Sequence, residues 1–297
     1  MTLDSRAVQY FLEVCRAGSI SQAARVLNLS QPSVSVAVSR LERVLGSQLF
    51  ERHRSGIRLT SAGQALRRRA EAMENLLQGA GREIHLLRAD ISGPLVIGGT
   101  PGALATVIPR TVGSLRKRFP RVELRILERP DSDLRTLLQS QTIDLAVVTL
   151  GMDATPDEFC ELQVLQDPFA LIVGRANGHR PDKVSLWDLE DAGWVLPDAV
   201  GGFRRHVDAL FVSSNTPVPR NVIRCDSLLT TKAIVRDTDY VTILPREVVG
   251  TELAIGELRA LQIEGADFER KVGFLWLREH PLDALATAFL EHARSWR

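Results

Sequence analysis

The spacing of apolar residues changes near residue 90, and this change constrains the fold more than any other feature of the sequence. Before it, apolar side chains recur every three to four residues, which is typical of amphipathic helices. After it, short apolar runs alternate with helical segments, which indicates an α/β domain with a mostly parallel sheet. We therefore expect a multidomain chain, since 297 residues also exceed what one hydrophobic core usually spans.

Charge is distributed unevenly between these two parts. Residues 1–70 hold eleven arginines, no lysine and four acidic residues, so they carry a formal net charge of +7 in a chain whose total is +1. A basic small domain joined to a mildly acidic larger one indicates that the first part meets a polyanion. The alternative is an ordinary solvated basic surface, which charge alone does not exclude.

Three short helices are predicted in the first 50 residues. The first ends before Ala17-Gly18, and Ser19 is a suitable N-cap for the second. A turn at residues 28–30 leads into the third, where Ser30 can cap and Pro32 lies in the first helical turn. This is the spacing of a helix-turn-helix, the motif whose second helix enters the major groove of DNA.

The outward side of the third helix is the predicted DNA-reading surface. Val34, Val38 and Leu41 face inward at helical spacing, which leaves short side chains outside that would fit a major groove. Beyond the helix, arginines surround Ser55-Gly56 and indicate a basic hairpin, or wing, suited to backbone phosphates. The alternative is that the polar residues are only caps and surface. The predicted DNA contacts are Ser21, Gln31, Pro32, Ser33, Ser35, Val36, Ser39, Arg40, Arg52, Arg54 and Arg58.

This segment resembles the N-terminal part of the LysR-type transcriptional regulators. The resemblance rests on residues that match in type and spacing: Phe11, Ser19, Ala23-Ala24, Leu27, Ser30-Gln31-Pro32, Ser35, Leu41-Glu42, Leu45-Gly46, Leu49-Phe50, Arg52, Leu59-Thr60 and Gly63. It implies a winged helix-turn-helix, rich in α-helix, that binds double-stranded DNA over about residues 1–60. Outward-facing Val36 and Ala37 stand where the family often has long polar residues, so we expect readout through Gln31, Ser33, thymine-methyl contact by Val36, and DNA shape.

A long linker helix with a heptad seam is predicted over residues 61–90. Apolar residues alternate steps of four and three through three heptads, which indicates pairing with the same helix of a second subunit. The alternative is a helix that lies on the core of its own domain. In the resembling family this helix dimerises and the sensor domains form tetramers, so we expect a homodimer that can assemble to a homotetramer. The predicted seam is Leu66, Ala70, Met73, Leu77, Ala80, Ile84 and Leu87.

The remaining chain, residues 91–297, is predicted to form two α/β units with a cleft between them. Four local motifs follow in the order found in the effector-binding domain of the same regulators: Gly98-Gly99-Thr100, Phe119-Pro120, Asp144-Leu145-Ala146 and Leu244-Pro245. The resemblance implies the two-lobed fold of type 2 periplasmic binding proteins. Lobe I is expected at about residues 91–163 and 267–297, and lobe II at about residues 164–266.

Two predicted strand-to-helix turns, at Thr100 and at residues 201–203, are expected to face this cleft. Backbone N–H groups at the start of a helix bind anions, and Arg204 adds positive charge, so we expect a small carboxylate or another anion. The alternative is that the glycines only shape turns. The predicted effector contacts are Thr100, Pro101, Gly102, Thr149, Gly201, Gly202, Phe203 and Arg204.

Sequence motifs of catalysis and cofactor binding are missing. No P-loop, GxGxxG or GxSxG occurs, the six histidines are scattered, and the three cysteines form no CxxC or Cys/His cluster. We therefore expect no enzyme, no cofactor and no metal site. The rival hypothesis is a binding protein or enzyme with an accessory N-terminal domain, which a signal peptide or a catalytic constellation would favour.

The expected function is that of a sequence-specific DNA-binding transcriptional regulator whose C-terminal domain senses a small molecule. Ligand binding and DNA binding are then coupled equilibria. RNA polymerase is a further candidate partner. No apolar run approaches 18 residues, and Asp4 and Glu13 interrupt the N-terminal apolar residues. We therefore expect neither membrane span nor signal peptide, and a cytoplasmic location.

Overall fold

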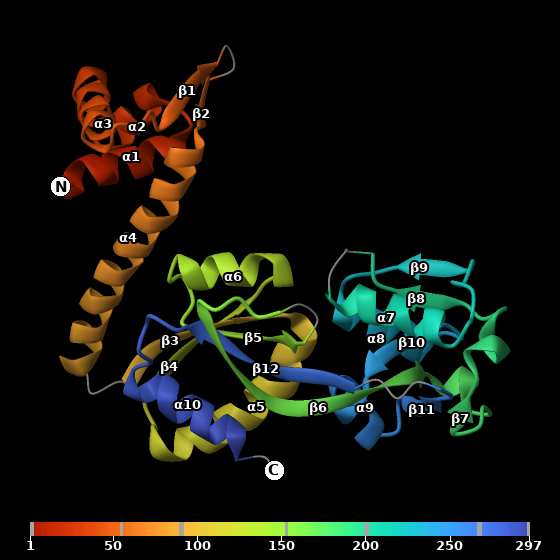
Figure 1. Cartoon of the computed structure of the whole chain (residues 1–297). Helices are drawn as coiled ribbons and strands as arrows, with labels where there is room; N and C mark the ends of the chain where they lie inside the picture. The colour runs from red at the N-terminus through yellow and green to blue at the C-terminus, as the bar shows by residue number, and fades with distance from the viewer. Residues whose placement is uncertain are drawn as a thin grey trace. The chain divides into compact units, whose positions relative to one another are not determined.

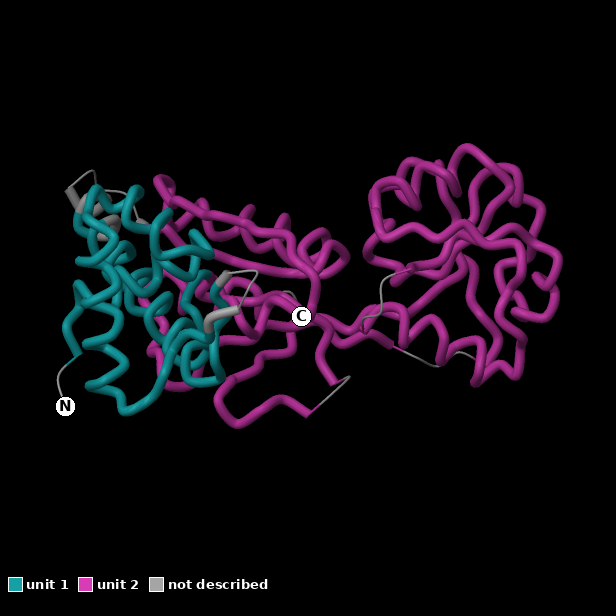
Figure 2. The backbone as a smooth tube through the Cα atoms, turned by 90° about the horizontal axis from the view of Figure 1, so that it is seen from above, with its two compact units in different colours: residues 1–88, 139–142 teal, residues 89–138, 143–297 magenta. Residues whose placement is uncertain are grey.

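The computed structural model describes residues 3–53, 56–88, 92–151, 154–198, 202–265 and 269–295. The chain falls into two compact units, one formed by residues 1–88 and 139–142 and the other by residues 89–138 and 143–297 (Figure 2). Each unit buries its own apolar clusters, as expected for parts with separate cores. Among the described residues, no helix combines the length and the apolar character that crossing a bilayer requires.

The first unit begins with three helices and a two-stranded hairpin, which confirms the predicted winged helix-turn-helix. Side chains of Asp4, Ser19 and Ser30 accept backbone N–H groups at the starts of the three helices, because the first N–H groups of a helix have no partner within it. The elements are α1 (Ser5–Ala17), α2 (Ile20–Val26), α3 (Gln31–Leu45), β1 (Phe50–His53) and β2 (Gly56–Leu59) (Figure 1).

Contacts around Phe11 and Leu49 fix the hairpin against the helices. Fully buried Phe11 of α1 lies against Phe50 of β1, with ring centroids 5.2 Å apart. Glu42 of α3 accepts the backbone N–H of Leu49 at 2.8 Å and so ties the hairpin to this helix. Gly63 lies so close to this segment that a Cβ there would stand 2.1 Å from the Leu49 carbonyl oxygen, so only glycine fits.

Helix α4 (Ser61–Arg88) presents two surfaces along its 28 residues. Leu66, Ala70 and Met73 pack into the cluster around Phe11, in the core of the first unit. By contrast, Leu77 is 64% exposed and Ile84 58% exposed, and Ala80 is exposed as well. This differs from the continuous seam that the sequence predicts: the alternative, a helix lying on its own core, accounts for the first half. Nothing is described of the Leu87 side chain.

In the second unit, ten described strands form one mixed sheet in the order β4-β3-β5-β12-β6-β10-β8-β9, in which β11 also pairs with β6 and β7 pairs with β11 (Figure 1). Lobe I consists of parallel strands and helices that cover them: β3 (Ser92–Gly99), α5 (Pro101–Arg118), β4 (Val122–Glu128), α6 (Asp131–Gln139), β5 (Leu145–Leu150) and α10 (Ala284–Arg294). Its core lies on both faces of these strands.

Lobe II repeats the alternation of strands and helices around fully buried Trp194, whose Nε1 donates to the Leu189 carbonyl oxygen at 3.2 Å. Its strands are β7 (Lys183–Val184), β8 (Trp194–Leu196), β9 (Val222–Arg224), β10 (Val241–Pro245) and β11 (Arg259–Ile263). Its helices are η1 (Arg175–Asn177), η2 (Leu186–Leu189), α7 (Gly202–Ser213), α8 (Leu228–Asp237), η3 (Arg246–Val249) and α9 (Gly250–Ala254).

Two long strands, β6 (Phe159–Val173) and β12 (Glu269–Leu277), connect the lobes. β6 pairs with β12 up to Pro168 and with β10 from Phe169 onward, so the passage between the lobes lies at this peptide bond. Both strands run antiparallel to their neighbours β5 and β10. The prediction of a mostly parallel sheet is therefore corrected to a mixed one.

Candidate functional site

The outer face of α3 gathers most of the predicted DNA contacts of this helix. Val34 and Val38 are buried, whereas Val36 between them is 67% exposed. Ala37, expected on the outside, is half-buried and packs on the core. The other exposed residues of this face are Gln31, Pro32, Ser33, Ser39 and Arg40, with Ser35 half-buried.

Ser33 has a structural role besides its exposed position. Its backbone N–H donates to Ser30 Oγ at 3.3 Å, and the two hydroxyl oxygens lie 2.7 Å apart. The Ser33 hydroxyl therefore already contacts Ser30, the N-cap of α3, and a base contact would use the same hydroxyl group. Gln31 is exposed at the start of the same helix.

The wing places basic residues on β1 and β2. Exposed Arg58 on β2 is the cross-strand partner of Glu51, and Arg52 on β1 is the partner of Ile57. Nothing is described of the Arg52 side chain, and Arg54 lies outside the described residues. Ser21 is exposed on α2. The predicted contacts thus come from α2, α3 and the wing of a single unit.

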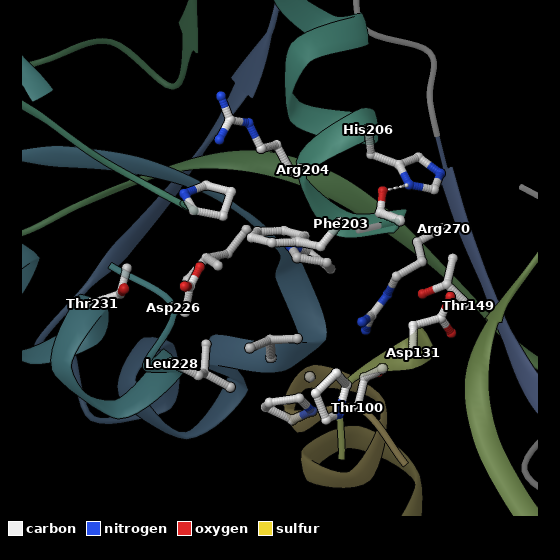
Figure 3. A pocket seen from close by; sticks show the side chains of 18 of the residues that line it. Thr100, Asp131, Thr149, Phe203, Arg204, His206, Asp226, Leu228, Thr231 and Arg270 are labelled. Carbon is white, nitrogen blue, oxygen red and sulfur yellow. Dashed lines mark hydrogen bonds between the residues drawn. The ribbon is translucent and has the colours of Figure 1, made fainter. Parts of the chain in front are cut away.

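A cavity of about 600 Å³ lies between the lobes of the second unit (Figure 3). Lobe I contributes the turn between β3 and α5, the loop after β4, and Thr149 of β5, while lobe II contributes the ends of β8 and β10 and the starts of α7 and α8. Gly201 lies outside the described residues. The other predicted effector residues all line this cavity: Thr100, Pro101, Gly102, Thr149, Gly202, Phe203 and Arg204.

Arg270 of β12 also lines the cavity, and sequence reasoning missed it. Its side chain is only 5% exposed, and Nη2 donates to Oδ2 of fully buried Asp167 at 2.9 Å. Asp167 Oδ1 also accepts the backbone N–H of Glu247 at 2.9 Å. Burial lowers the pKa of Arg270 and raises the pKa of Asp167, because each charged form loses hydration. The cavity therefore contains a buried cation that is held from one side.

Arg204, the cation that the sequence predicts for the ligand, is engaged elsewhere. Its Nη1 donates to the Asp198 carbonyl oxygen at 2.7 Å, and Nε lies 3.5 Å from Asp208 Oδ2. Figure 3 shows its guanidinium directed away from Arg270 and Thr100. Arg129, Arg135 and Arg205 also line the cavity, and so do Glu128, Asp131 and Asp226, so Arg270 is one of several charged residues there.

Phe203 and His206 form an aromatic wall on the α7 side of the cavity. The Phe203 ring stacks on Phe169 with centroids 6.4 Å apart, and the His206 ring lies 5.4 Å from Phe169. His206 Nδ1 lies 2.9 Å from the Gly202 carbonyl oxygen. Burial lowers the pKa of His206, and the charges of Arg270 and Arg205 lower it further. A neutral ring that donates from Nδ1 presents Nε2 as an acceptor.

The described residues contain no group of three His, Cys, Asp or Glu side chains placed to hold a metal ion. What the cleft does offer is the start of α5, where Thr100 makes no capping hydrogen bond with its side chain, beside the Arg270 guanidinium. These groups can donate hydrogen bonds to an anion, and both apolar and charged side chains line the cavity around them.

Two family descriptions match most of the chain. Residues 5–64 match "Bacterial regulatory helix-turn-helix protein, lysR family", and residues 88–297 match "LysR substrate binding domain". The chain is 26% identical over 295 residues to the HTH-type transcriptional regulator GbpR of Azospirillum brasilense, an alignment covering 99% of this chain and 86% of that protein. It is 25% identical over 293 residues to the regulator BsdA of Bacillus subtilis, covering 97% and 99% of the two chains.

Solved structures show the same fold. A full-length OxyR variant from Pseudomonas aeruginosa has a TM-score of 0.70 at 22% identity, covering 99% of this chain and 96% of that chain. CbnR, a LysR family transcriptional regulator, has a TM-score of 0.70 at 21% identity, covering 98% of each. With its N-terminal helix-turn-helix and its C-terminal α/β substrate-binding domain, the chain belongs to the LysR family of transcriptional regulators and is not an enzyme.

Proposed function

We propose that this regulator reads DNA sequence with the exposed face of α3 and holds backbone phosphates with the wing. The observation that carries the proposal is the division of α3 into a buried face, with Val34 and Val38, and an exposed face around Val36. Gln31 can hydrogen-bond a base edge, Arg40 can bond a base or a phosphate, and Val36 can contact a thymine methyl. CbnR, which this chain resembles in fold, has also been solved in complex with its target DNA, which supports this use of the domain.

The test begins with selection of bound fragments from random duplex DNA, followed by fluorescence anisotropy on the selected site and its single-base variants. Gln31→Ala and Val36→Ala are each expected to relax discrimination at one base position by about 1–3 kcal/mol. Val44→Ala is the matched control, because Val44 is 40% exposed near the far end of the same helix. Base preference unchanged in both α3-face variants would overturn the proposal.

The second half of α4 is proposed as the dimerisation surface, with Leu77, Ala80, Ile84 and Leu87 as seam residues. Exposed Leu76, Leu77 and Ile84 give this half an apolar side that is not covered within the first unit. A helix with such a side gains stability by pairing with a second copy, and a closed two-fold dimer is the commonest outcome. Assembly to a tetramer through the second units follows from the family resemblance.

The cleft of the second unit is proposed to bind a small anionic effector, and this binding changes the affinity for operator DNA. A cavity of about 600 Å³, lined by apolar side chains together with polar and charged ones, has the size of a small-molecule site. Thr100→Val is expected to reduce the response of operator binding to active fractions of a metabolite extract at least tenfold. Thr287→Val is the control, since Thr287 is exposed on α10. An undiminished response in Thr100→Val would overturn this assignment.

A further inference from the structure

The buried guanidinium of Arg270 has more hydrogen-bond donors than the protein uses. An arginine side chain carries five N–H donors in a fixed fork. In the described part of the chain, the Arg270 side chain makes one hydrogen bond, from Nη2 to Asp167, and its Nε is buried without a partner. Buried donors without partners are costly and call for an explanation such as a bound group.

The remaining donors lie beside the start of α5. A Cβ built on Gly102 would stand 3.0 Å from Arg270 Nη1, so this nitrogen lies directly against the first turn of the helix. α5 has 18 residues and a positive dipole end at its start. The N–H groups of Ala103 and Leu104 donate to the Thr100 carbonyl oxygen, and Pro101 has no N–H, so among the described residues of this turn the Gly102 N–H is the backbone donor left for a ligand. Thr100 lines the same side of the cavity and makes no capping hydrogen bond with its side chain. Donors from β12 and from α5 thus converge on one part of the cavity (Figure 3).

The charge of the pair limits which anion fits. Asp167 lies 2.9 Å from Arg270 and is fully buried, so the two side chains together are neutral before any ligand arrives. Counted with this pair alone, a monoanion leaves one net negative charge and a dianion leaves two, and desolvation makes the second charge more costly. The planar fork of a guanidinium also matches the two oxygens of a carboxylate.

We infer that Arg270 binds the anionic group of the effector, that this group is a monocarboxylate, and that Asp167 is the residue that positions the guanidinium. The inference rests on the proposed function of the cleft and names the chemistry of the ligand within it. Phe203, Leu228 and Val248 line the same cavity and leave room for an apolar body attached to the carboxylate. Since Arg270 and Asp167 lie on the two strands that join the lobes, the ligand is bound where the chain passes between them.

The probe is acetate, the smallest carboxylate that can enter without a specific body. Titration of the full-length protein with ¹³C-labelled acetate, at constant ionic strength set with chloride, is expected to give saturable binding with a Kd in the millimolar range. Arg270→Met should weaken this binding at least tenfold, and Arg270→Lys should weaken it less. Arg118→Met is the matched control, because Arg118 is exposed on α5 and does not line the cavity.

Folding is kept separate from binding by a double variant. Arg270→Met alone leaves Asp167 buried without its counter-charge, whereas Asp167→Asn/Arg270→Met removes both charges. A cooperative thermal transition of the double variant shows that it is folded. This folded variant should also fail to bind acetate at the site. Equal acetate affinity in this variant and the wild type, or no saturable binding in the wild type up to 100 mM, overturns the inference. If Arg204→Met loses acetate binding and Arg270→Met keeps it, Arg204 is the residue that binds the anion, and the inference about Arg270 is overturned as well.

Sulfate tests the choice of a monoanion and the role of Asp167. We expect sulfate to bind at least tenfold more weakly than acetate in the wild type, and sulfate binding tighter than acetate overturns the carboxylate assignment. Asp167→Asn leaves the guanidinium uncompensated, so it should raise the affinity for sulfate more than that for acetate. A purely structural role of Asp167 would not change this ratio.

Operator binding, measured on the same samples by anisotropy, separates this inference from the proposed function. A wild-type protein that selects no DNA site, or an active effector fraction without effect on operator binding, contradicts the proposed function. A protein that binds its operator normally and binds acetate independently of Arg270 contradicts only the inference made here.

Discussion

Arg270 and Asp167 are direct cross-strand neighbours in the antiparallel pairing of β12 with β6, and they also form the buried ion pair of the cleft. The geometry of the pair is therefore set by the backbone of both strands. A side chain that contacts an anion at this point is held more rigidly than one on a loop, because strand register fixes both Cα positions.

The first prediction concerns the stability of this pair. Arg270→Met and Asp167→Asn should each lower the free energy of unfolding by about 3–5 kcal/mol, since each leaves one buried group without its partner. The double variant should lower the free energy of unfolding by less than either single variant does. Urea unfolding of the four proteins forms a complete double-mutant cycle. Additive losses would show that the two side chains are not energetically coupled.

A second prediction concerns DNA binding and salt. If the wings and α3 helices of a dimer neutralise about eight phosphates, log K against log[salt] should have a slope of about −7. Arg58→Ala should lower the affinity for every DNA sequence alike and reduce the slope by about 1 per site lost. Anisotropy titrations at four salt concentrations measure both quantities. An effect of Arg58→Ala confined to one sequence would instead assign this residue to base readout.

A third prediction separates the two halves of α4. Leu77→Glu and Ile84→Glu should release monomers that keep the melting temperature of the first unit, because both residues are exposed there. Ala70→Glu should instead destabilise this unit, because Ala70 is buried in its core. Sedimentation equilibrium and thermal melting distinguish the outcomes. Unaltered dimers in both glutamate variants of the second half would remove the pairing proposal.

How much could be predicted from sequence depends on whether the determining contacts are local. Ser19, Ser30 and Gly46 mark helix ends within a few residues, so the helix-turn-helix could be found without a structure. The α4 seam could not be divided in advance, since Ala70 and Leu77 follow the same spacing whether the helix meets its own core or a second subunit.

Arg270 could not be assigned to the cleft from the sequence, for a different reason. Arg270 lies between Glu269 and Lys271, a charged run that resembles a solvated strand end. Its burial depends on Asp167, which is 103 residues earlier in the chain. The first half of β6 was missed for a related reason: its exposure alternates between half-buried and exposed, so it lacks the apolar run that revealed its second half.

A fourth prediction concerns pH. Burial lowers the pKa of His206 below its ordinary value of 6.5. As pH falls through 6.5, the unfolded chain takes up a proton that the native ring does not, so the free energy of unfolding decreases until the pH reaches the folded pKa. His206→Gln should lessen the loss of stability between about pH 7 and pH 5. His179→Gln, at an exposed position, is the control. An unchanged pH dependence in His206→Gln would contradict the prediction.

A fifth prediction concerns Cys15, which packs against the core of the first unit. Burial raises the pKa of the Cys15 thiol to about 11. Since the thiolate is the reactive form, iodoacetamide should label Cys15 at about pH 8 much more slowly in the native protein than in urea. Peptide mass spectrometry over a time course measures the two rates. Equal rates in both conditions would show that the thiol is accessible and ionised.

The chain passes from lobe I to lobe II through β6 and returns through β12, and this order determines when each lobe can be completed during synthesis. Lobe II is one continuous segment, whereas lobe I needs β12 and α10, whose Phe289 and Ala293 are fully buried in its core. The ribosome therefore synthesises the DNA-binding unit first, then the strands β3, β4 and β5 of lobe I, and then lobe II. The strand β12 and the helix α10, which complete lobe I, are synthesised last. A nascent chain halted before residue 284 has α1, α2, α3 and α4 but lacks α10, the helix that closes the core of lobe I.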